Sequence, residues 1–177
     1  GEVTLTELIK SEGEGPASIR GLVYREPGKG ACTTGERPNI ADLDTLPFPA
    51  YEKLKNYPAA YRLPIFNYPR TPNASCISSR GCPYACTYCD RSVFGRSFRY
   101  NSAEYIYEHL AYLKRRFGVR HINFYDDQFT FNRERIATLT EMMMKRSLSI
   151  TFNCVVRAEH VDVDLIRQMK RAGCWMI

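Results

Sequence analysis

The chain from residue 74 onwards alternates between two hydrophobic rhythms. Short runs of β-branched and aromatic residues, typical of strands, are each followed by a segment in which apolar residues recur at helical spacing. The predicted strands are 74–78, 121–125, 150–156 and 174–177. The apolar helix faces are Ile106, Leu110, Leu113 and Phe117, then Ile136, Leu139 and Met143, then Leu165, Ile166 and Met169. Strands and helices that alternate over short connections predict a parallel sheet with right-handed crossovers.

Polar caps and glycines mark the ends of these helices. Asn101 is predicted to begin the first helix, because a glutamate follows three residues later as in a capping box, and Gly118 is predicted to end it. Asn132 and Asp162 are predicted to cap the other two helices, and Gly173 to end the last. A closed eight-unit barrel needs about 250 residues. The predicted fold is therefore α/β, a partial TIM-like barrel of parallel strands that comprises its first three to four βα units.

Residues 1–37 predict a smaller, separate unit. Leu5, Leu8 and Ile9 form an apolar stripe on a helix predicted over 4–10. The hairpin predicted after it has strands over 19–24 and 31–34 and a turn at 27–30. One helix and one hairpin bury little core by themselves, so this unit is expected to lean on another part of the protein.

Residues 38–73 are predicted to be a linker to the α/β segment, 74–177. Proline at the density found here blocks helices and favours extended, semi-rigid chain. The prolines are Pro38, Pro47, Pro49, Pro58, Pro64, Pro69 and Pro72, and the interleaved aromatic residues are Phe48, Tyr51, Tyr57, Tyr61, Phe66 and Tyr68. Because basic residues are sparse in this segment, the aromatic side chains are expected to dock on a protein surface, with stacking on nucleic acid as the alternative.

Composition and charge narrow the class of protein. The chain is 44% hydrophobic and 25% charged, as globular proteins are, with no apolar run near the ~20 residues of a membrane span and no signal-peptide pattern at its start. Seven cysteines, odd in number and clustered, argue for a reducing compartment and a cytoplasmic protein. The net charge is +6, and basic residues cluster at 114–116 and 170–171. These cations are expected to complement the C-termini of helices, with a phosphate-binding or nucleic-acid-binding surface as the alternative. The chain starts without Met and ends after an apolar run, so we expect a fragment.

Three of the cysteines, Cys82, Cys86 and Cys89, lie within eight residues at the spacing Cys-x3-Cys-x2-Cys. No neighbouring His or fourth Cys completes a ligand set, which suits a cubane iron–sulfur cluster with one open iron, whereas structural zinc is the alternative. An open coordination position is typical of catalytic metal sites, a rule stated for zinc and applied here by analogy. The other cysteines, predicted to be buried small hydrophobes, are Cys32, Cys76, Cys154 and Cys174.

Candidate functional residues follow three of the predicted strands. The cysteine loop follows the first strand, Asp126 and Asp127 follow the second, and Arg157 follows the third. In parallel α/β folds the chemistry gathers at the carboxyl ends of the strands, so these residues are expected to converge on one edge. The alternatives are a capping or turn role for the two aspartates and a solvent ion pair for Arg157.

The stretch Ser-Arg-Gly-Cys-Pro-Tyr-Ala-Cys-Thr-Tyr-Cys (79–89) resembles the radical S-adenosylmethionine (SAM) superfamily, in which an aromatic residue, here Tyr88, precedes the third cysteine. Residues 123–130, 157–162 and 169–174 resemble one branch of it, in which a cobalamin-binding domain precedes the barrel. Residues 1–50 resemble the end of such a domain and its exit. The resemblance therefore implies that 1–37 is the carboxyl-terminal remnant of a cobalamin-binding-type domain.

The resemblance also implies the cofactors and the chemistry. A four-iron, four-sulfur cluster would bind to Cys82, Cys86 and Cys89, and SAM would bind at its open iron. A 5′-deoxyadenosyl radical from SAM would abstract hydrogen from a small organic substrate, for methyl transfer or oxidative cyclisation that depends on cobalamin bound mainly outside this chain. Electrons would come from a reductant such as flavodoxin or ferredoxin. Tyr88 would lie by the adenine of SAM. Asp126 and Asp127 would contact the amino group of SAM, and Arg157 would contact its carboxylate.

Two alternatives remain open at this point. One is a radical SAM enzyme without cobalamin, such as a methylthiotransferase. The other, from a different class, is a non-catalytic iron–sulfur electron-transfer or metal-binding module, in which four protein ligands would hold the cluster. Nucleic acid is not expected as a partner.

Overall fold

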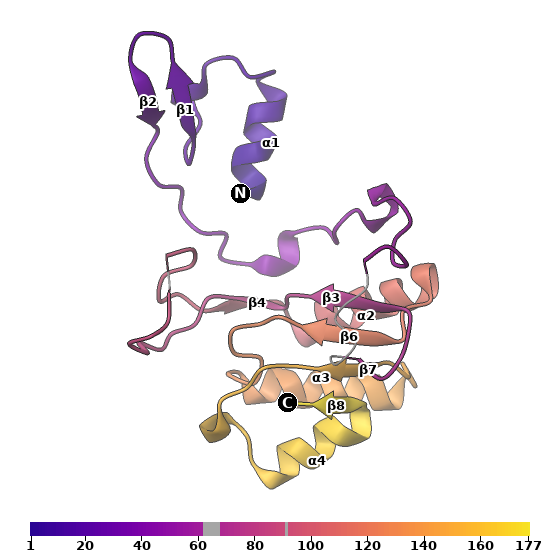
Figure 1. Cartoon of the computed structure of the whole chain (residues 1–177). Helices are drawn as coiled ribbons and strands as arrows, with labels where there is room; N and C mark the ends of the chain where they lie inside the picture. The colour runs from indigo at the N-terminus through magenta and orange to yellow at the C-terminus, as the bar shows by residue number, and fades with distance from the viewer. Residues whose placement is uncertain (62–67, 91) are drawn as a thin grey trace. The chain divides into compact units, whose positions relative to one another are not determined.

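The computed structural model describes residues 1–61, 68–90 and 92–177, and the chain forms two compact units, Gly1–Ala41 and Asp42–Ile177 (Figure 1). The unit boundary after Ala41 lies close to the predicted start of the linker. The division into 1–37, 38–73 and 74–177 stays a prediction about domains. Two linker residues of the sequence argument, Pro64 and Phe66, lie outside the described residues.

The first unit contains the predicted helix and hairpin. Helix α1 (Glu2–Lys10) is followed by a 3-10 turn, η1 (Pro16–Ser18), and by strands β1 (Val23–Glu26) and β2 (Gly30–Thr33), which pair antiparallel. The first strand starts later than predicted, because Gly21 adopts the left-handed conformation at φ 83°. The apolar stripe of α1 is largely exposed, with Leu5 at 57%.

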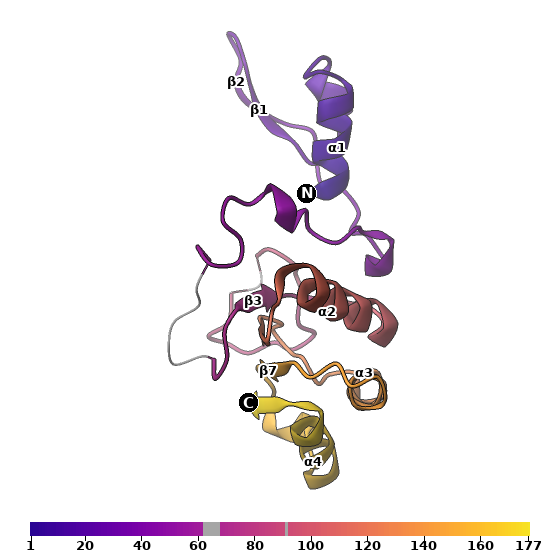
Figure 2. The same cartoon turned by 90° about the vertical axis from the view of Figure 1, so that its right-hand side faces the viewer.

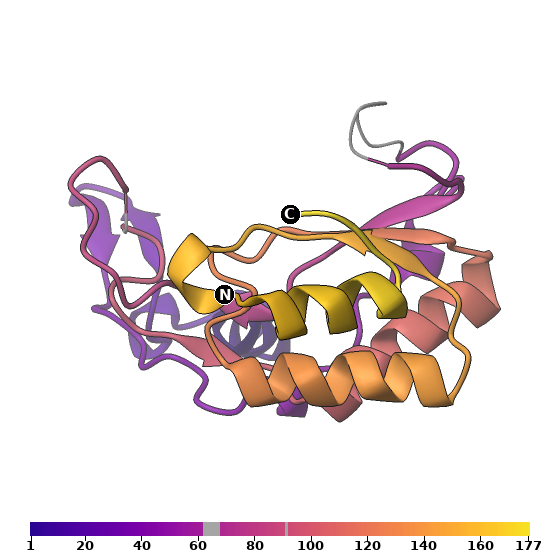
Figure 3. The ribbon, with the colours of Figure 1, turned by 90° about the horizontal axis from the view of Figure 1, so that it is seen from below.

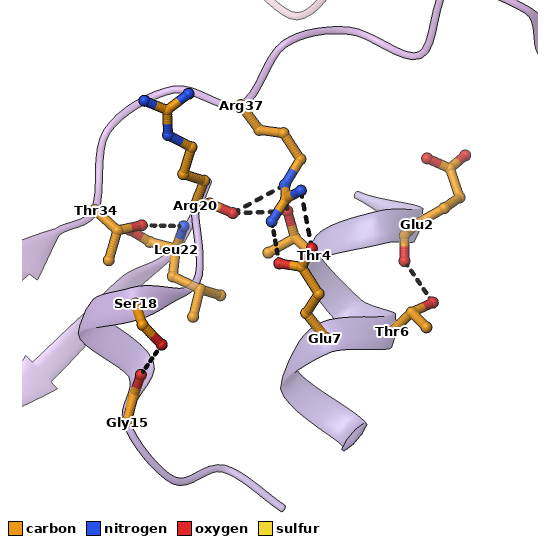
Figure 4. Close-up of polar contacts among 10 residues, drawn as sticks. All are labelled: Glu2, Thr4, Thr6, Glu7, Gly15, Ser18, Arg20, Leu22, Thr34 and Arg37. Atoms are coloured by element: carbon orange, nitrogen blue, oxygen red, sulfur yellow. Dashed lines mark hydrogen bonds and ion pairs between the residues drawn. The ribbon is translucent and has the colours of Figure 1, made fainter. Parts of the chain in front are cut away.

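Polar contacts centred on Arg37 join the parts of this unit (Figure 4). Arg37 Nε donates to Thr4 Oγ1 at 3.0 Å, and its Nη1 donates to Glu7 Oε1 at 3.2 Å. Thr4 Oγ1 in turn donates to the carbonyl oxygen of Arg20 at 3.0 Å. Hydrogen bonds therefore join α1 to the segment before the hairpin, whereas the sequence predicts only an apolar stripe on α1.

The second unit is an α/β sheet with helices on one face. Strands β3 (Asn73–Cys76), β6 (His121–Phe124), β7 (Thr151–Asn153) and β8 (Cys174–Met176) are parallel, in the order β3-β6-β7-β8. Helices α2 (Ala103–Phe117), α3 (Arg133–Lys145) and α4 (Val163–Ala172) connect them. Figures 2 and 3 show the three helices along the same face of the sheet. The predicted parallel sheet is confirmed, as an open sheet in the described residues.

Most of the predicted helix ends are confirmed. The side chains of Asn132 and Asp162 accept hydrogen bonds from the first turns of α3 and α4, and Gly118 and Gly173 end α2 and α4 in the left-handed conformation. The predicted start of α2 at Asn101 is wrong. Ser102 caps this helix, because Ser102 Oγ accepts from the amide of Tyr105 at 3.0 Å.

One predicted face position is also wrong. Ile166 of α4 is 39% exposed, whereas its neighbours Leu165 and Met169 are buried. These two residues lie four positions apart, so they share one face of the helix, and Ile166 lies beside that face. Each strand of the parallel sheet is shorter than predicted, as at β7, which covers Thr151–Asn153 within the predicted 150–156, and β3 also starts one residue early, at Asn73.

The two faces of the sheet differ in chemistry. Ile122, Phe124 and Phe152 are buried in the hydrophobic core. Side chains alternate along a strand, so His121 and Thr151 belong to the opposite face. There His121 Nδ1 lies 2.9 Å from Thr151 Oγ1, and its Nε2 lies 2.9 Å from Asn123 Oδ1. The face away from the helices is therefore polar along β6 and β7.

The start of the predicted linker docks on α2. Phe48 stacks on His109 with ring centroids 4.7 Å apart, and Tyr51 hydroxyl lies 3.0 Å from His109 Nε2. Asp44 accepts from the amide of Ser102 at 2.9 Å and from the side chain of Asn101 at 3.0 Å. Docking of these aromatic residues is confirmed. In the ranges that the structure describes, no helix is long and apolar enough to cross a membrane.

Candidate metal and cofactor site

The three clustered cysteines lie on a loop closed by a short antiparallel pair. Strands β4 (Ser79–Arg80) and β5 (Arg99–Tyr100) pair at the base of the loop 81–98, just after the carboxyl end of β3 (Figure 1). Gly81 starts the loop at φ 86°, and a Cβ there would lie 2.1 Å from the carbonyl oxygen of Ser97. Only glycine allows the two sides of the loop to approach this closely.

The donor chemistry of this loop fits an iron–sulfur cluster. Cys82 and Cys86 are half-buried, Cys89 is exposed, and all three are free thiols. The amide of Cys89 donates to the carbonyl of Cys86 at 3.2 Å, so a turn joins these two cysteines. Across the described part of the chain, no three His, Cys, Asp or Glu side chains are already gathered as a metal site. The loop offers three thiolate donors, whose convergence would accompany binding.

Asp126 lies at the base of the loop. Its carboxylate is 2% exposed and accepts from the amide of Ser78 at 3.1 Å, from Ser78 Oγ at 2.8 Å and from Ser79 Oγ. Burial raises the pKa of the Asp126 carboxyl, and the serine donors together with Arg135 oppose that rise. The carboxylate thus points at the loop base, and both of its oxygens accept from protein donors.

Arg135 of α3 completes this base. It is buried, and its Nη1 donates to the carbonyl of Ser78 at 3.1 Å while its Nη2 donates to the carbonyl of Phe129 at 2.8 Å. Its guanidinium also lies over the ring of Tyr100 in β5, 5.1 Å from the centroid. One buried cation therefore joins the residue before β4, strand β5 and the segment after β6, a role that the sequence pattern did not indicate.

Arg157 lies at the tip of the site. It follows β7, before the 3-10 helix η5 (Ala158–His160), and its Nη1 donates to Cys86 Sγ at 3.4 Å. The guanidinium lies over the ring of Tyr84, 4.2 Å from the centroid, and Nε donates to Glu159 Oε1 at 2.7 Å. The carboxylate of Glu159 raises the pKa of Arg157. Tyr84 hydroxyl also bonds to His160 Nε2.

The expected convergence is thus seen for some residues. The cysteine loop, Asp126 and Arg157 meet at the carboxyl ends of β3, β6 and β7. Tyr88 is 91% exposed and Asp127 is exposed as well, so their predicted contacts with SAM stay predictions. Tyr84 and His160 were missed by the sequence argument, although His160 follows Arg157 by three residues in the same predicted loop.

Comparison with known proteins gives the family. The model of the Radical SAM superfamily matches residues 76–177. An uncharacterized methyltransferase of Pyrococcus horikoshii is 32% identical over 98% of this chain, which spans 37% of that protein. The anaerobic magnesium-protoporphyrin IX monomethyl ester cyclase of Synechocystis is 28% identical over 74% of this chain, which spans 28% of the cyclase. The chain thus spans well under half of the length of these relatives.

Among solved structures, the radical SAM methyltransferase TsrM from Kitasatospora setae superposes with a TM-score of 0.74 at 18% identity. The superposition covers 98% of this chain and 34% of TsrM. Another structure of TsrM holds cobalamin and a four-iron, four-sulfur cluster. This likeness confirms the predicted partial TIM-like barrel. The family match also confirms the prediction of an enzyme superfamily whose members use such a cluster with SAM. Since the match includes the cysteine loop and more than half of the chain, we conclude that the chain belongs to the radical SAM superfamily.

Proposed function

We propose that the protein containing this chain is a cobalamin-dependent radical SAM methyltransferase that acts on a small organic substrate. The observation that carries the proposal is the loop 81–98, which presents three free thiols at the carboxyl edge of a parallel sheet, with Arg157 against Cys86. The methyltransferase name of the Pyrococcus relative and the cobalamin and cluster of TsrM support the methyl-transfer branch.

The residues of the chain take separate roles in this proposal. Cys82, Cys86 and Cys89 would hold the cluster, which when bound supplies the electron that breaks the S–C5′ bond of SAM. Asp126 fixes the base of the loop through the two serines that precede it. The carboxylate of SAM is one candidate partner of Arg157, because its planar fork matches that group, and Cys86, which Arg157 contacts in this structure, is the other.

The exposure of the loop suits its electron supply. Cys89 and the residues around it are exposed, so a protein reductant such as flavodoxin or ferredoxin could approach this side closely. Asp127 would lie by the amino group of SAM and Tyr88 by its adenine. For Asp126 the geometry favours holding the loop over touching SAM, since protein donors already occupy both oxygens of its carboxylate.

Oxidative ring closure is the second candidate function. The cyclase of Synechocystis is similar to this chain over 74% of its length, which favours this outcome independently of the methyltransferases. The two reactions differ in their products, because methyl transfer adds one carbon to the substrate whereas ring closure removes hydrogen and adds none. Mass spectrometry of the product therefore separates them.

The test uses the full-length protein, reconstituted anaerobically with iron and sulfide, reduced, and mixed with SAM. We expect a four-iron cluster and release of 5′-deoxyadenosine, and both should be lost in Cys82→Ala, Cys86→Ala and Cys89→Ala. Cys32→Ala is the matched control, because Cys32 is a half-buried free thiol in β2, outside the loop. A wild-type protein that carries the cluster but releases no 5′-deoxyadenosine would refute the radical function.

A further inference from the structure

We propose that Arg157 is a positioning residue for the cluster, which stabilises its reduced state through an N–H···S hydrogen bond to Cys86. This inference rests on the proposed function, because it requires the cluster to be bound to Cys86. It assigns Arg157 a role that does not involve SAM. The geometry points to it, because Nη1 of Arg157 already lies 3.4 Å from Cys86 Sγ.

Three further contacts fix the direction of this donor. The aromatic ring of Tyr84, 4.2 Å from the guanidinium carbon, supports the flat face of the group. Glu159 Oε1 accepts from Nε at 2.7 Å and pairs with Nη2 at 2.6 Å, so it holds one edge of the fork. The amide of Arg157 donates to the buried side chain of Gln128 at 3.0 Å. These contacts leave Nη1 aimed at the cysteine loop.

The same contacts weaken the case for SAM as the partner of Arg157. A carboxylate bound by a guanidinium fork takes two parallel N–H donors along one edge. In this structure Glu159 occupies the edge formed by Nε and Nη2, and Cys86 faces Nη1. SAM could take that edge only by displacing Glu159, and could take the other edge, formed by Nη1 and Nη2, only by sharing Nη1 with Cys86 and Nη2 with Glu159. The arrangement therefore favours contact of Arg157 with the sulfur of Cys86 over contact with SAM.

The expected effect follows from charge. Reduction adds one electron to the cluster, supplied by an external one-electron reductant, and makes the cluster more negative without making or breaking a bond. Hydrogen bonds to the cysteine sulfurs and nearby positive charge stabilise that state and raise the reduction potential. Glu159 offsets part of the charge of Arg157, and both side chains are partly exposed, at 54% and 36%. Removal of Arg157 should therefore lower the potential, and neutralisation of Glu159 should raise it.

The experiment is a redox titration of the full-length, cluster-loaded protein in the absence of SAM, monitored by electron paramagnetic resonance. In Arg157→Gln we expect the equilibrium constant for reduction to fall about tenfold, equivalent to about 59 mV for one electron. Arg157→Lys should recover part of this loss, since it keeps the charge but not the planar fork. Glu159→Gln should shift the potential in the opposite direction. Arg133→Gln is the matched control, because Arg133 forms an exposed ion pair with Asp162 nearby in the chain.

Binding of SAM to the same variants separates the two roles of Arg157. A potential that is unchanged in both Arg157→Gln and Glu159→Gln, at wild-type iron content, overturns the inference, and weaker SAM binding alongside it assigns Arg157 to SAM. If Arg157→Gln fails to assemble the cluster, the direction of the shift in Glu159→Gln decides the matter. A wild-type protein that never assembles a four-iron cluster would instead overturn the proposed function, and this inference with it.

Discussion

We expect the docking of the linker on α2 to depend on pH, because it encloses a buried histidine. His109 is enclosed by Phe48, which stacks on it, by Tyr51, whose hydroxyl lies 3.0 Å from Nε2, and by Cys76, whose Sγ lies 3.6 Å from Nδ1. Burial lowers the pKa of His109 from 6.5 to about 4. Between about pH 6.5 and pH 4, the ring therefore stays neutral in the folded protein, whereas the unfolded chain binds a proton.

The size of the effect follows from the two pKa values of His109. Because the folded pKa is the lower one, the unfolded chain binds the proton first, and stability is full above pH 6.5 and falls as the pH drops towards 4. Each pKa unit corresponds to about 1.4 kcal/mol, so the whole shift costs about 3 kcal/mol at low pH. Between pH 7.5 and pH 5 the expected loss is about 2 kcal/mol.

The assay is native-state hydrogen exchange of α2 in the full-length protein, measured by mass spectrometry and corrected for intrinsic exchange at each pH. The opening free energy of α2 should fall by about 2 kcal/mol from pH 7.5 to pH 5 in the wild type. His109→Phe should lose most of this pH dependence, although it leaves Tyr51 hydroxyl without its partner and lowers stability at every pH. Tyr112→Phe, on the same helix, should follow the wild type. An equal slope in wild type and His109→Phe would show that protonation of this ring does not control the docking.

Two further predictions concern the base of the cysteine loop. Gly81→Ala should lower the iron content of the reconstituted protein strongly, because its Cβ would lie 2.1 Å from the carbonyl oxygen of Ser97, whereas Gly95→Ala, which shares a positive φ of 62° but meets nothing within 4 Å, should lower it much less. Equal iron in both variants would mean that the close approach at Gly81 does not shape the loop. Arg135→Met should destabilise the protein by about 3 kcal/mol in urea unfolding, since it leaves the buried carbonyl oxygens of Ser78 and Phe129 without their donor and removes a positive charge that acts on the buried Asp126. A loss within about 0.5 kcal/mol, typical of surface substitutions, would contradict a stabilising role for the buried contacts of Arg135.

The elements that the sequence predicted well are those set by local signals. The side chains of Asn132 and Asp162 cap helices because they bond to amides three residues along the chain, at Arg135 and Leu165. Gly118 ends α2 because glycine adopts the left-handed backbone conformation at a lower free-energy cost than other residues. Such contacts span a few residues, so a single sequence contains all the information they need.

The predictions that failed concern residues whose contacts lie in distant parts of the chain. Asn101 carries a capping pattern, but its amide donates to the carbonyl of Ser78 and its side chain bonds to Asp44, so the helix begins after Ser102. Asp126 stands in a position typical of cofactor contacts, yet its carboxylate bonds to Ser78, 48 residues earlier. No periodicity in the sequence encodes those partners, which depend on how the strands align.

These distant contacts divide the candidate site into a base and a tip, and substitutions in the two parts are expected to affect different properties of the cluster. At the base, Asp126 and Arg135 hold the strands from which the loop leaves, and in the described part of the chain neither side chain hydrogen-bonds to the three loop cysteines. At the tip, Arg157 touches Cys86 directly. Substitutions at the base should therefore change how much cluster assembles without changing its potential, whereas substitutions at the tip should change the potential of the cluster that does assemble. The spacing of the cysteines predicts the metal ligands, whereas we expect residues far away in sequence, such as Arg157, to set the reduction potential of the centre.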